Sequence, residues 1–162
     1  MTRRIAYIGL GSNLGDRSDT LMAVVKLLNE DEGIVVRRIS QFIETQPVGG
    51  PPRQGKYFNA AAEIEITLSP VDLLHALAAV EATLGRDRSR ERYWGPRTCD
   101  LDILLMGDLV MDTDKLTIPH PRMHQRGFVL RPLAEIAPDA LHPLLHKTVS
   151  QLLGELGGQG GT

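Results

Sequence analysis

The chain has 162 residues, a formal net charge of −2, 42% hydrophobic and 23% charged residues. These values are ordinary for a globular protein and predict one domain over residues 1–162, with a flexible tail at 157–162. The slightly acidic balance argues against a general nucleic-acid binder. The sequence has no apolar run of about 18 residues and no secretory segment, and its single cysteine, Cys99, fits a reducing compartment. We therefore expect a cytoplasmic protein that does not span a membrane.

The first segments predict a strand at residues 5–10 and a helix at 21–28, from an apolar run followed by apolar residues at helical spacing. Three glycines near their junction indicate a tight turn or a close approach between segments: Gly9, Gly11 and Gly15. A dinucleotide-binding fingerprint would need a further glycine at position 14, where Leu14 stands. The glycines are therefore better explained by backbone geometry than by that fingerprint.

Residues 34–43 are rich in β-branched side chains and predict a strand, and the alternating pattern of residues 58–66 predicts another. Between them, residues 45–57 hold three prolines and three glycines, which exclude regular structure. A loop of this length in a compact domain is usually functional. Thr45, Tyr57 and Asn59 flank it and carry groups able to hydrogen-bond to or stack on a planar ligand. We interpret this loop as a candidate lid.

A helix is predicted from Pro70, with Ser69 as its N-cap, to an end before Gly85. Glu81 lies near its C-terminal end, where a carboxylate is unfavourable against the helix dipole. An arginine neighbour at the surface or a contact with a ligand would explain this residue equally well. Residues 85–97 then hold five arginines against two acids, Asp87 and Glu91. The arginines are Arg86, Arg88, Arg90, Arg92 and Arg97.

Asp100 and Asp102 stand at the start of a predicted strand, and alternation places them on one face with Leu101, Ile103 and Leu105 on the other. Two adjacent carboxylates favour a bound divalent cation, most naturally Mg²⁺, although the solvated face of an edge strand would show the same pattern. The neighbouring arginines favour the metal, because arginine binds phosphate bidentately and Mg²⁺ usually binds through carboxylates together with substrate phosphates. Cys99 falls on the opposite face and is interpreted as structural.

The C-terminal part predicts a hairpin turn at Gly107 and Asp108, and helices at residues 128–136 and 149–156. His120 and His124 have the spacing of a zinc pair on a helix, but prolines at 119 and 121 break the segment. We therefore favour His120 as a donor to phosphate. His142 and His146 repeat the spacing without an acidic partner and are predicted to be surface residues.

Three stretches carry a family resemblance: Gly11-Ser-Asn-Leu, Arg92-Tyr-Trp-Gly-Pro-Arg-Thr-Cys-Asp-Leu-Asp-Ile, and Ile118-Pro-His-Pro-Arg-Met with Arg126-Gly-Phe-Val-Leu-Arg-Pro-Leu. Together they resemble the 6-hydroxymethyl-7,8-dihydropterin pyrophosphokinases of folate biosynthesis over residues 5–153. The resemblance implies an α+β fold of ferredoxin-like type, a mainly antiparallel sheet with helices packed on it. It also implies a monomer that transfers pyrophosphate from ATP to the pterin hydroxymethyl oxygen and releases AMP.

The resemblance also implies roles for individual residues. Asp100 and Asp102 would hold two Mg²⁺ ions, and Arg86 and Arg97 would act on the phosphates. The ATP site would further contain Glu81, Arg88, Trp94, Ile103, Thr117, His120 and Arg126. Tyr57 and Phe128 would sandwich the pterin, and Thr45, Gln46, Val48 and Asn59 would read its edge.

Departures from the family pattern affect details of these contacts. Gln46 stands where relatives commonly have proline, Pro121 stands where an aromatic also occurs, and the lid loop is one residue longer. Two other classes of function fit parts of the pattern: a metal-dependent phosphohydrolase using the same aspartates, and a nucleic-acid-binding module using the arginines with Tyr93 and Trp94. A content of 4% aromatic residues weighs against the second.

Overall fold

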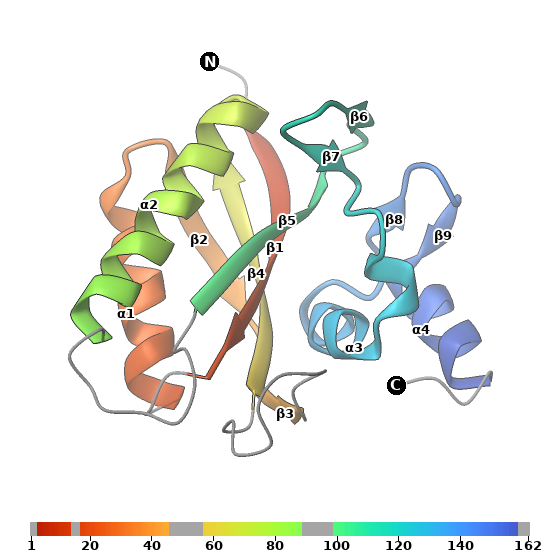
Figure 1. Cartoon of the computed structure of the whole chain (residues 1–162). Coiled ribbons are helices and arrows are strands. Elements are labelled where there is room, and N and C mark those ends of the chain that lie inside the picture. Colours follow the sequence, from red (N-terminus) through yellow and green to blue (C-terminus); the bar gives the residue numbers. More distant parts are fainter. Residues whose placement is uncertain (1–2, 14–16, 46–56, 89–98, 159–162) are drawn as a thin grey trace.

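The computed structural model describes residues 3–13, 17–45, 57–88 and 99–158 (Figure 1). Its central sheet has the strand order β2-β4-β1-β5, with β3 also paired to β4, and all of these pairings are antiparallel. The strands are β1 Arg4–Ser12, β2 Ile34–Ile39, β3 Ile43–Thr45, β4 Tyr57–Ile66 and β5 Cys99–Met106. Helices α1 Arg17–Glu30 and α2 Pro70–Arg88 complete a βαββαβ arrangement, so the predicted ferredoxin-like α+β fold is confirmed.

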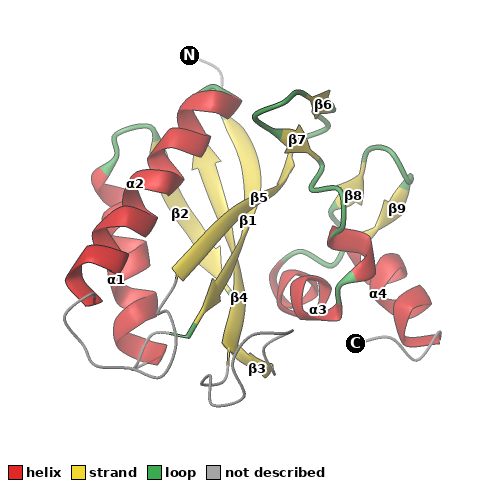
Figure 2. Cartoon of the chain, in the orientation of Figure 1, coloured by secondary structure: helices red, strands yellow, loops and turns green. Residues whose placement is uncertain are grey.

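Helices lie on both sides of the sheet (Figure 2). The helices α1 and α2 form one layer, and α3 Gly127–Ile136 and α4 Val149–Gly158 lie on the other side. A short 3-10 helix, Met123–Gln125, precedes α3, and two small hairpins pair β6 Met111–Asp112 with β7 Thr117–Ile118 and β8 Leu141–His142 with β9 Lys147–Thr148. Within the described residues, no helix is long and apolar enough to cross a membrane.

The face of the sheet under α1 and α2 is apolar along its length, and we call it the closed face. It contains alternate residues of β1 and β4, such as Ile8 and Ile64, and they pack against Leu28 of α1 and Leu77 of α2. Burying each such side chain contributes roughly 1.5–3 kcal/mol. As predicted, the Ser69 side chain caps α2, because its hydroxyl accepts a hydrogen bond from the Asp72 N–H at 3.1 Å.

The opposite face is divided into two parts. Near the carboxyl end of β5, Leu104 and Leu105 pack with Ala61, Leu130 and Leu133 in a second apolar core under α3. Near the start of β5 the same face is polar, and we call this part the polar face. A register shift between β1 and β5 separates the two parts, because Ile8 pairs with Ile103 and Tyr7 with Leu105.

That register shift corrects the prediction for Leu105. Strict alternation would place Leu105 with Ile103 on the closed face, but Leu105 packs with Leu104 in the second core, whereas Met106 returns to the closed face. A β-bulge inserts one extra residue and so changes which face the following side chains occupy. A sequence pattern of period two cannot reveal such an insertion.

Other features also differ from the predictions. The helix α2 continues through Gly85 to Arg88, because one glycine in a helix costs only about 1 kcal/mol and adopts no left-handed conformation here. The turn at Gly107 and Asp108 does not pair β6 with β5, since β6 pairs with β7. The predicted strand at 34–43 is split in two at Ser40, where the Ser40 hydroxyl accepts a hydrogen bond from the Ala61 N–H at 2.8 Å.

Candidate functional site

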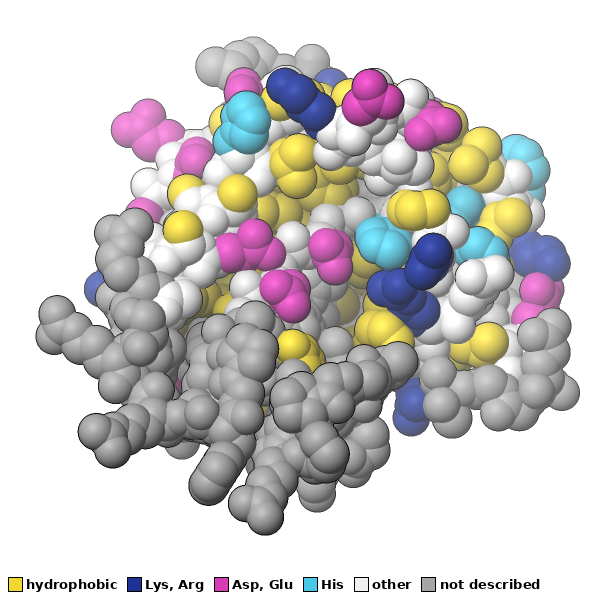
Figure 3. Space-filling model, in the orientation of Figure 1, with side chains coloured by type: hydrophobic (Ala, Val, Ile, Leu, Met, Phe, Trp, Pro, Cys, Tyr) yellow, Lys and Arg dark blue, Asp and Glu magenta, His cyan; other side chains and the backbone are white. Residues whose placement is uncertain are grey.

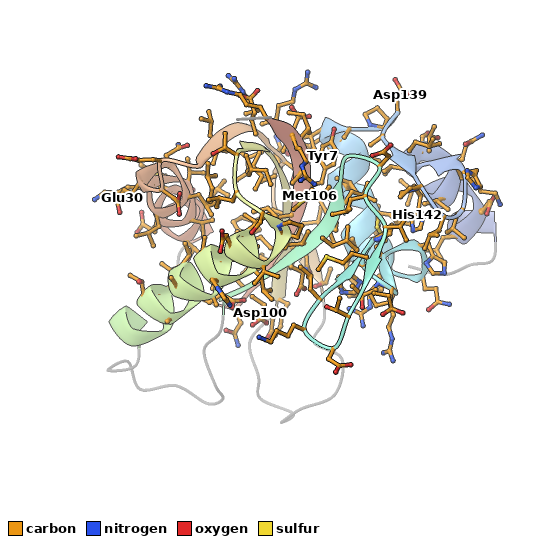
Figure 4. All side chains as sticks on the ribbon, turned by 90° about the horizontal axis from the view of Figure 1, so that it is seen from above. Tyr7, Glu30, Asp100, Met106, Asp139 and His142 are labelled. Carbon is orange, nitrogen blue, oxygen red and sulfur yellow. The ribbon has the colours of Figure 1, made fainter. Side chains whose placement is uncertain are left out.

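The polar face contains the two aspartates that the sequence singled out. Asp100 and Asp102 are both exposed, whereas Cys99, Leu101 and Ile103 are buried in the closed face, as alternation predicts. Asp100 and Met106 mark opposite ends of β5 in Figure 4. Figure 3 shows acidic side chains near the centre of the molecular face in view, with histidine and basic side chains beside them. The two carboxylates are therefore available to a ligand.

The neighbouring strand β1 presents glycine opposite each aspartate. Gly11 pairs with Asp100 on one side and with Asn59 on the other, and Gly9 pairs with Asp102 and Ala61. A Cβ atom on Gly11 would lie 3.1 Å from Asn59 Nδ2. Gly9 and Gly11 lie within β1 and not in a turn, whereas Gly15 falls outside the described residues. The close-approach explanation applies to Gly11.

Asn59 is held in place by a second residue from the predicted set. The Thr45 hydroxyl donates a hydrogen bond to Asn59 Oδ1 at 2.7 Å, across the β3–β4 pairing. The amide nitrogen of Asn59 lies over Gly11. An amide fixed in this way offers a donor of defined direction at the edge of the polar face.

A cavity of about 290 Å³ lies directly beside Asp102. It is lined by four predicted site residues from three different segments: Asp102, Ile103, Thr117 and His120. The cavity also includes residues that sequence reasoning missed, namely Leu74, Lys115 and Leu116. Lys115 and Leu116 belong to the β6–β7 hairpin, and the failure to predict that hairpin explains why they were missed.

His120 is oriented by two contacts with the backbone. Its backbone N–H donates a hydrogen bond to the Leu104 carbonyl at 2.9 Å, and its ring Nδ1 accepts one from the backbone N–H of Arg122 at 3.2 Å. The neutral ring therefore carries its proton on Nε2, assigned from this hydrogen bond. Burial lowers the pKa of His120. The nearby Arg126 and Arg122 lower this pKa further, whereas Asp102 raises it. The ring remains a hydrogen-bond donor without being charged.

Arg126 and Phe128 meet at the start of α3. The Arg126 guanidinium lies over the Phe128 ring, 5.6 Å from its centroid, in a cation–π contact. The helix α3 packs against β3 and β4, the strands that carry Thr45 and Tyr57. The helix that begins beside Arg126 and Phe128 therefore packs on the strands that carry two of the residues predicted for the pterin.

Glu81 contacts the backbone of β5. Its Oε2 accepts a hydrogen bond from the Leu101 N–H at 2.6 Å. Burial raises the pKa of Glu81, and Asp100 and Asp102 raise it further, whereas the hydrogen bond from Leu101 lowers it. Neither alternative from the sequence, a surface carboxylate beside an arginine or a ligand contact, anticipated this bond.

Several predicted residues lie outside the described part of the structure. Gln46, Val48, Trp94 and Arg97 fall in the undescribed ranges, and the side chains of Arg86 and Arg88 at the end of α2 are not described either. Their predicted roles remain predictions.

The spacing in sequence grouped His120 with His124 and His142 with His146, but the ring contact in the structure joins His124 and His142. His124 and His142 lie edge to face with their ring centroids 6.2 Å apart. His142 is buried, so its prediction as a surface residue was wrong; its Nδ1 accepts hydrogen bonds from the Leu144 and Leu145 N–H groups. Among the described residues, no three His, Cys, Asp or Glu side chains are grouped so as to hold a metal ion. The zinc alternative therefore gains no support.

A larger cavity of about 620 Å³ lies elsewhere. Tyr7 of β1 and Leu105 of β5 line one part of it, and Leu141 and His146 line another. It contains none of the predicted site residues. Its polar groups include Tyr7 and Glu63, whose side chains are hydrogen-bonded at 3.3 Å. Size alone does not identify the site, because the paired carboxylates, the oriented histidine and the fixed amide lie at the polar face.

Comparisons with known proteins point to one family. The family model described as 7,8-dihydro-6-hydroxymethylpterin-pyrophosphokinase (HPPK) matches residues 7–138. The chain is 48% identical over 132 residues to 2-amino-4-hydroxy-6-hydroxymethyldihydropteridine pyrophosphokinase of Bacillus subtilis, covering 82% of this chain and 77% of that protein. The protein of the same name from Haemophilus influenzae is 44% identical over 151 residues, covering 93% and 89% of the two chains.

A solved structure supports the fold. Wild-type HPPK-DHPS of Plasmodium falciparum with pteroate superposes with a TM-score of 0.74 at 13% identity, over 98% of this chain and 45% of that one. This chain thus spans less than half of that longer protein, and the match concerns the fold alone. The family match includes most of β1 and all of β4 and β5, the strands that form the polar face. The chain therefore belongs to the 7,8-dihydro-6-hydroxymethylpterin-pyrophosphokinase family.

Proposed function

We propose that this chain transfers the pyrophosphoryl group of ATP to the hydroxymethyl oxygen of 6-hydroxymethyl-7,8-dihydropterin at its polar face, releasing AMP. This is the reaction of its family in folate biosynthesis. The observation that carries the placement is the exposed pair Asp100 and Asp102 on β5, beside the cavity that contains His120 and Thr117. Membership of the family weighs against the hydrolase and nucleic-acid-binding alternatives.

The donor set suits Mg²⁺. Asp100 and Asp102 offer exposed carboxylate oxygens on one side of an edge strand, and Mg²⁺ is usually bound through one or two carboxylates together with substrate phosphates. Because no third protein ligand stands beside the two carboxylates among the described residues, coordination positions would remain for the phosphates of ATP. We propose two ions at this pair. When bound, Mg²⁺ would neutralise charge on the phosphates and polarise the phosphoryl oxygens.

The cavity beside Asp102 suits the nucleotide. Ile103 and Thr117 line it with apolar and hydroxyl groups, and His120 borders it as a neutral donor for a phosphate oxygen. Arg126 would bring a cation to the same phosphates. We assign Arg86, Arg88, Trp94 and Arg97 to this subsite from the family resemblance, and Glu81 to its neighbourhood.

The pterin subsite is proposed at the edge formed by β3, β4 and α3. Tyr57 and Phe128 would stack on the two faces of the ring, and Asn59, oriented by Thr45, would bond its edge. Gln46 and Val48 belong to this subsite by resemblance. Since Arg126 lies over Phe128 here, stacking on that ring face would require the guanidinium to move toward the phosphates.

Catalysis in this arrangement rests on positioning and charge neutralisation. The residues of the polar face would align the pterin hydroxymethyl oxygen with the β-phosphorus of ATP, and arginines would stabilise charge on the transferred group. No general base is assigned among the described residues of the polar face. Exclusion of water by the segments at 45–57 and 85–96 would prevent hydrolysis of ATP.

The test is product analysis with purified protein. Mg-ATP and 6-hydroxymethyl-7,8-dihydropterin are mixed with the protein, and AMP, ADP and the pterin product are resolved, with controls that lack pterin or metal. We expect AMP to form only when both pterin and Mg²⁺ are present, in an amount equal to that of the pyrophosphorylated pterin. Formation of ADP, or phosphate release without pterin, would contradict it.

We also propose that the protein acts as a monomer. The family resemblance implies a monomer, and the described residues assigned to the site lie around one face of one sheet. Light scattering coupled to size-exclusion chromatography should give a mass near 17.8 kDa, and a stable dimer whose dissociation abolishes activity would refute the proposal.

A further inference from the structure

The edge of β5 has an unusual hydrogen-bond partner. In the described sheet β5 lies at the end of the strand order, with β1 on one side. Leu101 lies between the two aspartates, and its N–H points away from β1 to meet the Glu81 carboxylate of α2 at 2.6 Å. Without Glu81 this N–H would lack a partner beside a largely buried residue, which is costly.

A carboxylate is an energetically unfavourable acceptor for the Leu101 N–H at this position. Glu81 is half-buried, and it lies close enough to Asp100 and Asp102 for both to act on it electrostatically. A third negative charge beside an existing pair is destabilising unless a cation or a hydrogen-bond donor compensates it. Its hydrogen bond to Leu101 is short and charge-assisted, and bonds of this kind are about twice as strong as neutral ones.

Glu81 does not join the aspartates as a third ligand in this arrangement. The described residues contain no group of three acidic, histidine or cysteine side chains that could hold a metal ion. The carboxylate is directed at the backbone between the two aspartates. Its hydrogen bond therefore acts on the backbone that carries the aspartates, in addition to its electrostatic interaction with their carboxylates.

The same bond joins the two elements that flank the arginine-rich segment. The helix α2 ends at Arg88 and β5 begins at Cys99, and α2 packs along β5. The hydrogen bond between Glu81 and Leu101 fixes the start of β5 relative to α2. The positions from which Asp100 and Asp102 project are then set by the helix.

We propose that Glu81 is a positioning residue that holds the free edge of β5 at Leu101, so that Asp100 and Asp102 are set for a divalent cation before it binds. This inference rests on the proposed function of the aspartate pair. Groups that orient metal ligands in this indirect way typically change metal affinity by roughly 10-fold to 100-fold when removed. Glutamine retains a carbonyl acceptor for the Leu101 N–H, and alanine does not.

The first measurement is amide hydrogen exchange at Leu101, followed by NMR in the metal-free protein. Glu81→Ala should accelerate exchange about 10-fold or more, because the amide loses its acceptor. Glu81→Gln should remain near the wild-type rate. Glu30→Gln, the same change at an exposed position of α1, is the matched control and should have no effect.

The second measurement is binding of Mn²⁺ by electron paramagnetic resonance, in the presence of a non-hydrolysable ATP analogue. Glu81→Ala should weaken Mn²⁺ binding about 10-fold, and Glu81→Gln should restore most of the affinity. A Leu101 exchange rate unchanged in Glu81→Ala, or an unchanged Mn²⁺ affinity, would overturn the inference. A loss in Glu81→Gln equal to that in Glu81→Ala would also overturn it, since the charge would then act directly. If the wild-type protein fails to bind Mn²⁺, the proposed function fails with it, and the exchange data still report on the hydrogen bond.

Discussion

The two faces of the central sheet are built from the same strands but perform different tasks. On β1, Ile8 and Leu10 are buried under α1 and α2, whereas Gly9 and Gly11 face the other way beside the aspartates. Core and site residues therefore alternate along one strand. A substitution on one face should leave the other face largely unaffected, so stability and activity can be tested separately.

Within the second face, β5 changes character at its bulge. Asp100 and Asp102 precede it, and Leu104 and Leu105 follow it under α3. The extra residue brings two adjacent leucines into the second core, and this core anchors the strand directly behind the exposed carboxylates. A packed apolar segment therefore lies on one side of the bulge, and the exposed carboxylates lie on the other side.

The largest effect is expected from Asp102→Ala. The side chain is exposed, so its loss should leave the melting temperature nearly unchanged. Pterin-dependent AMP formation should fall roughly 100-fold to 1,000-fold, because bound metal contributes several kcal/mol of charge stabilisation. Turnover and thermal unfolding, measured on the same preparation, check both expectations. Normal turnover would refute the metal assignment.

Leu77→Ala tests the closed face. Leu77 is 1% exposed in the core between α2 and the sheet, and its truncation should reduce the free energy of unfolding by about 2–5 kcal/mol. Turnover per folded molecule should change little at a temperature where the variant remains folded. Denaturant titration gives the stability, and Met22→Ala, at a position 70% exposed on α1, is the control. Comparable losses in both variants would contradict the separation of the faces.

Local patterns were sufficient to predict much of the fold and the placement of the aspartates. Alternation placed Asp100 and Asp102 opposite Leu101 and Ile103, and the N-cap at Ser69 located the start of α2. These predictions succeeded because period and capping are properties of adjacent residues. The family resemblance supplied hypotheses for the roles of the site residues, which periodicity could not, and these remain predictions.

The errors arose where distant segments determine the local structure. The orientation of Leu105 depends on a bulge set by pairing with β1, and the pairing of His124 with His142 depends on how β8 packs near the 3-10 helix. The bond from Glu81 to Leu101 joins residues 20 apart in sequence. No local pattern encodes such contacts, so a sequence read in short windows cannot reveal them.

A smaller effect is expected from filling the space above the polar face. In Gly11→Ala the new Cβ would lie 3.1 Å from Asn59 Nδ2, so the amide must move by a few tenths of an ångström although Thr45 holds its other end. The KM for the pterin should rise about 3-fold to 10-fold, with little change in the KM for ATP, since a misplaced hydrogen bond costs roughly 1 kcal/mol. Steady-state kinetics with each substrate varied separately provide the test.

Gly9→Ala is the matched control for that substitution. Its Cβ would contact the Leu104 side chain at 3.4 Å, an ordinary van der Waals distance. Both KM values should stay near those of the wild type. An equal rise in the pterin KM for Gly9→Ala would show that general distortion of β1, and not the contact with Asn59, controls pterin binding.

The smallest effect should appear in the pH dependence of stability, far from the polar face. Burial lowers the pKa of His142, with a further contribution from His124, whereas the pKa of histidine in the unfolded chain is about 6.5. Below that pH the unfolded chain binds the proton more readily than the native protein does. The contribution of neutral His142 to stability is therefore fully present above that pH and is lost as the pH falls. His142→Asn keeps an acceptor for the Leu144 and Leu145 N–H groups but removes the titration.

The melting temperature of the wild type should therefore fall more than that of His142→Asn between about pH 7.5 and pH 5.5, while turnover at the higher pH stays equal. Parallel melting curves for the two proteins over this range would show that another group controls the acid sensitivity.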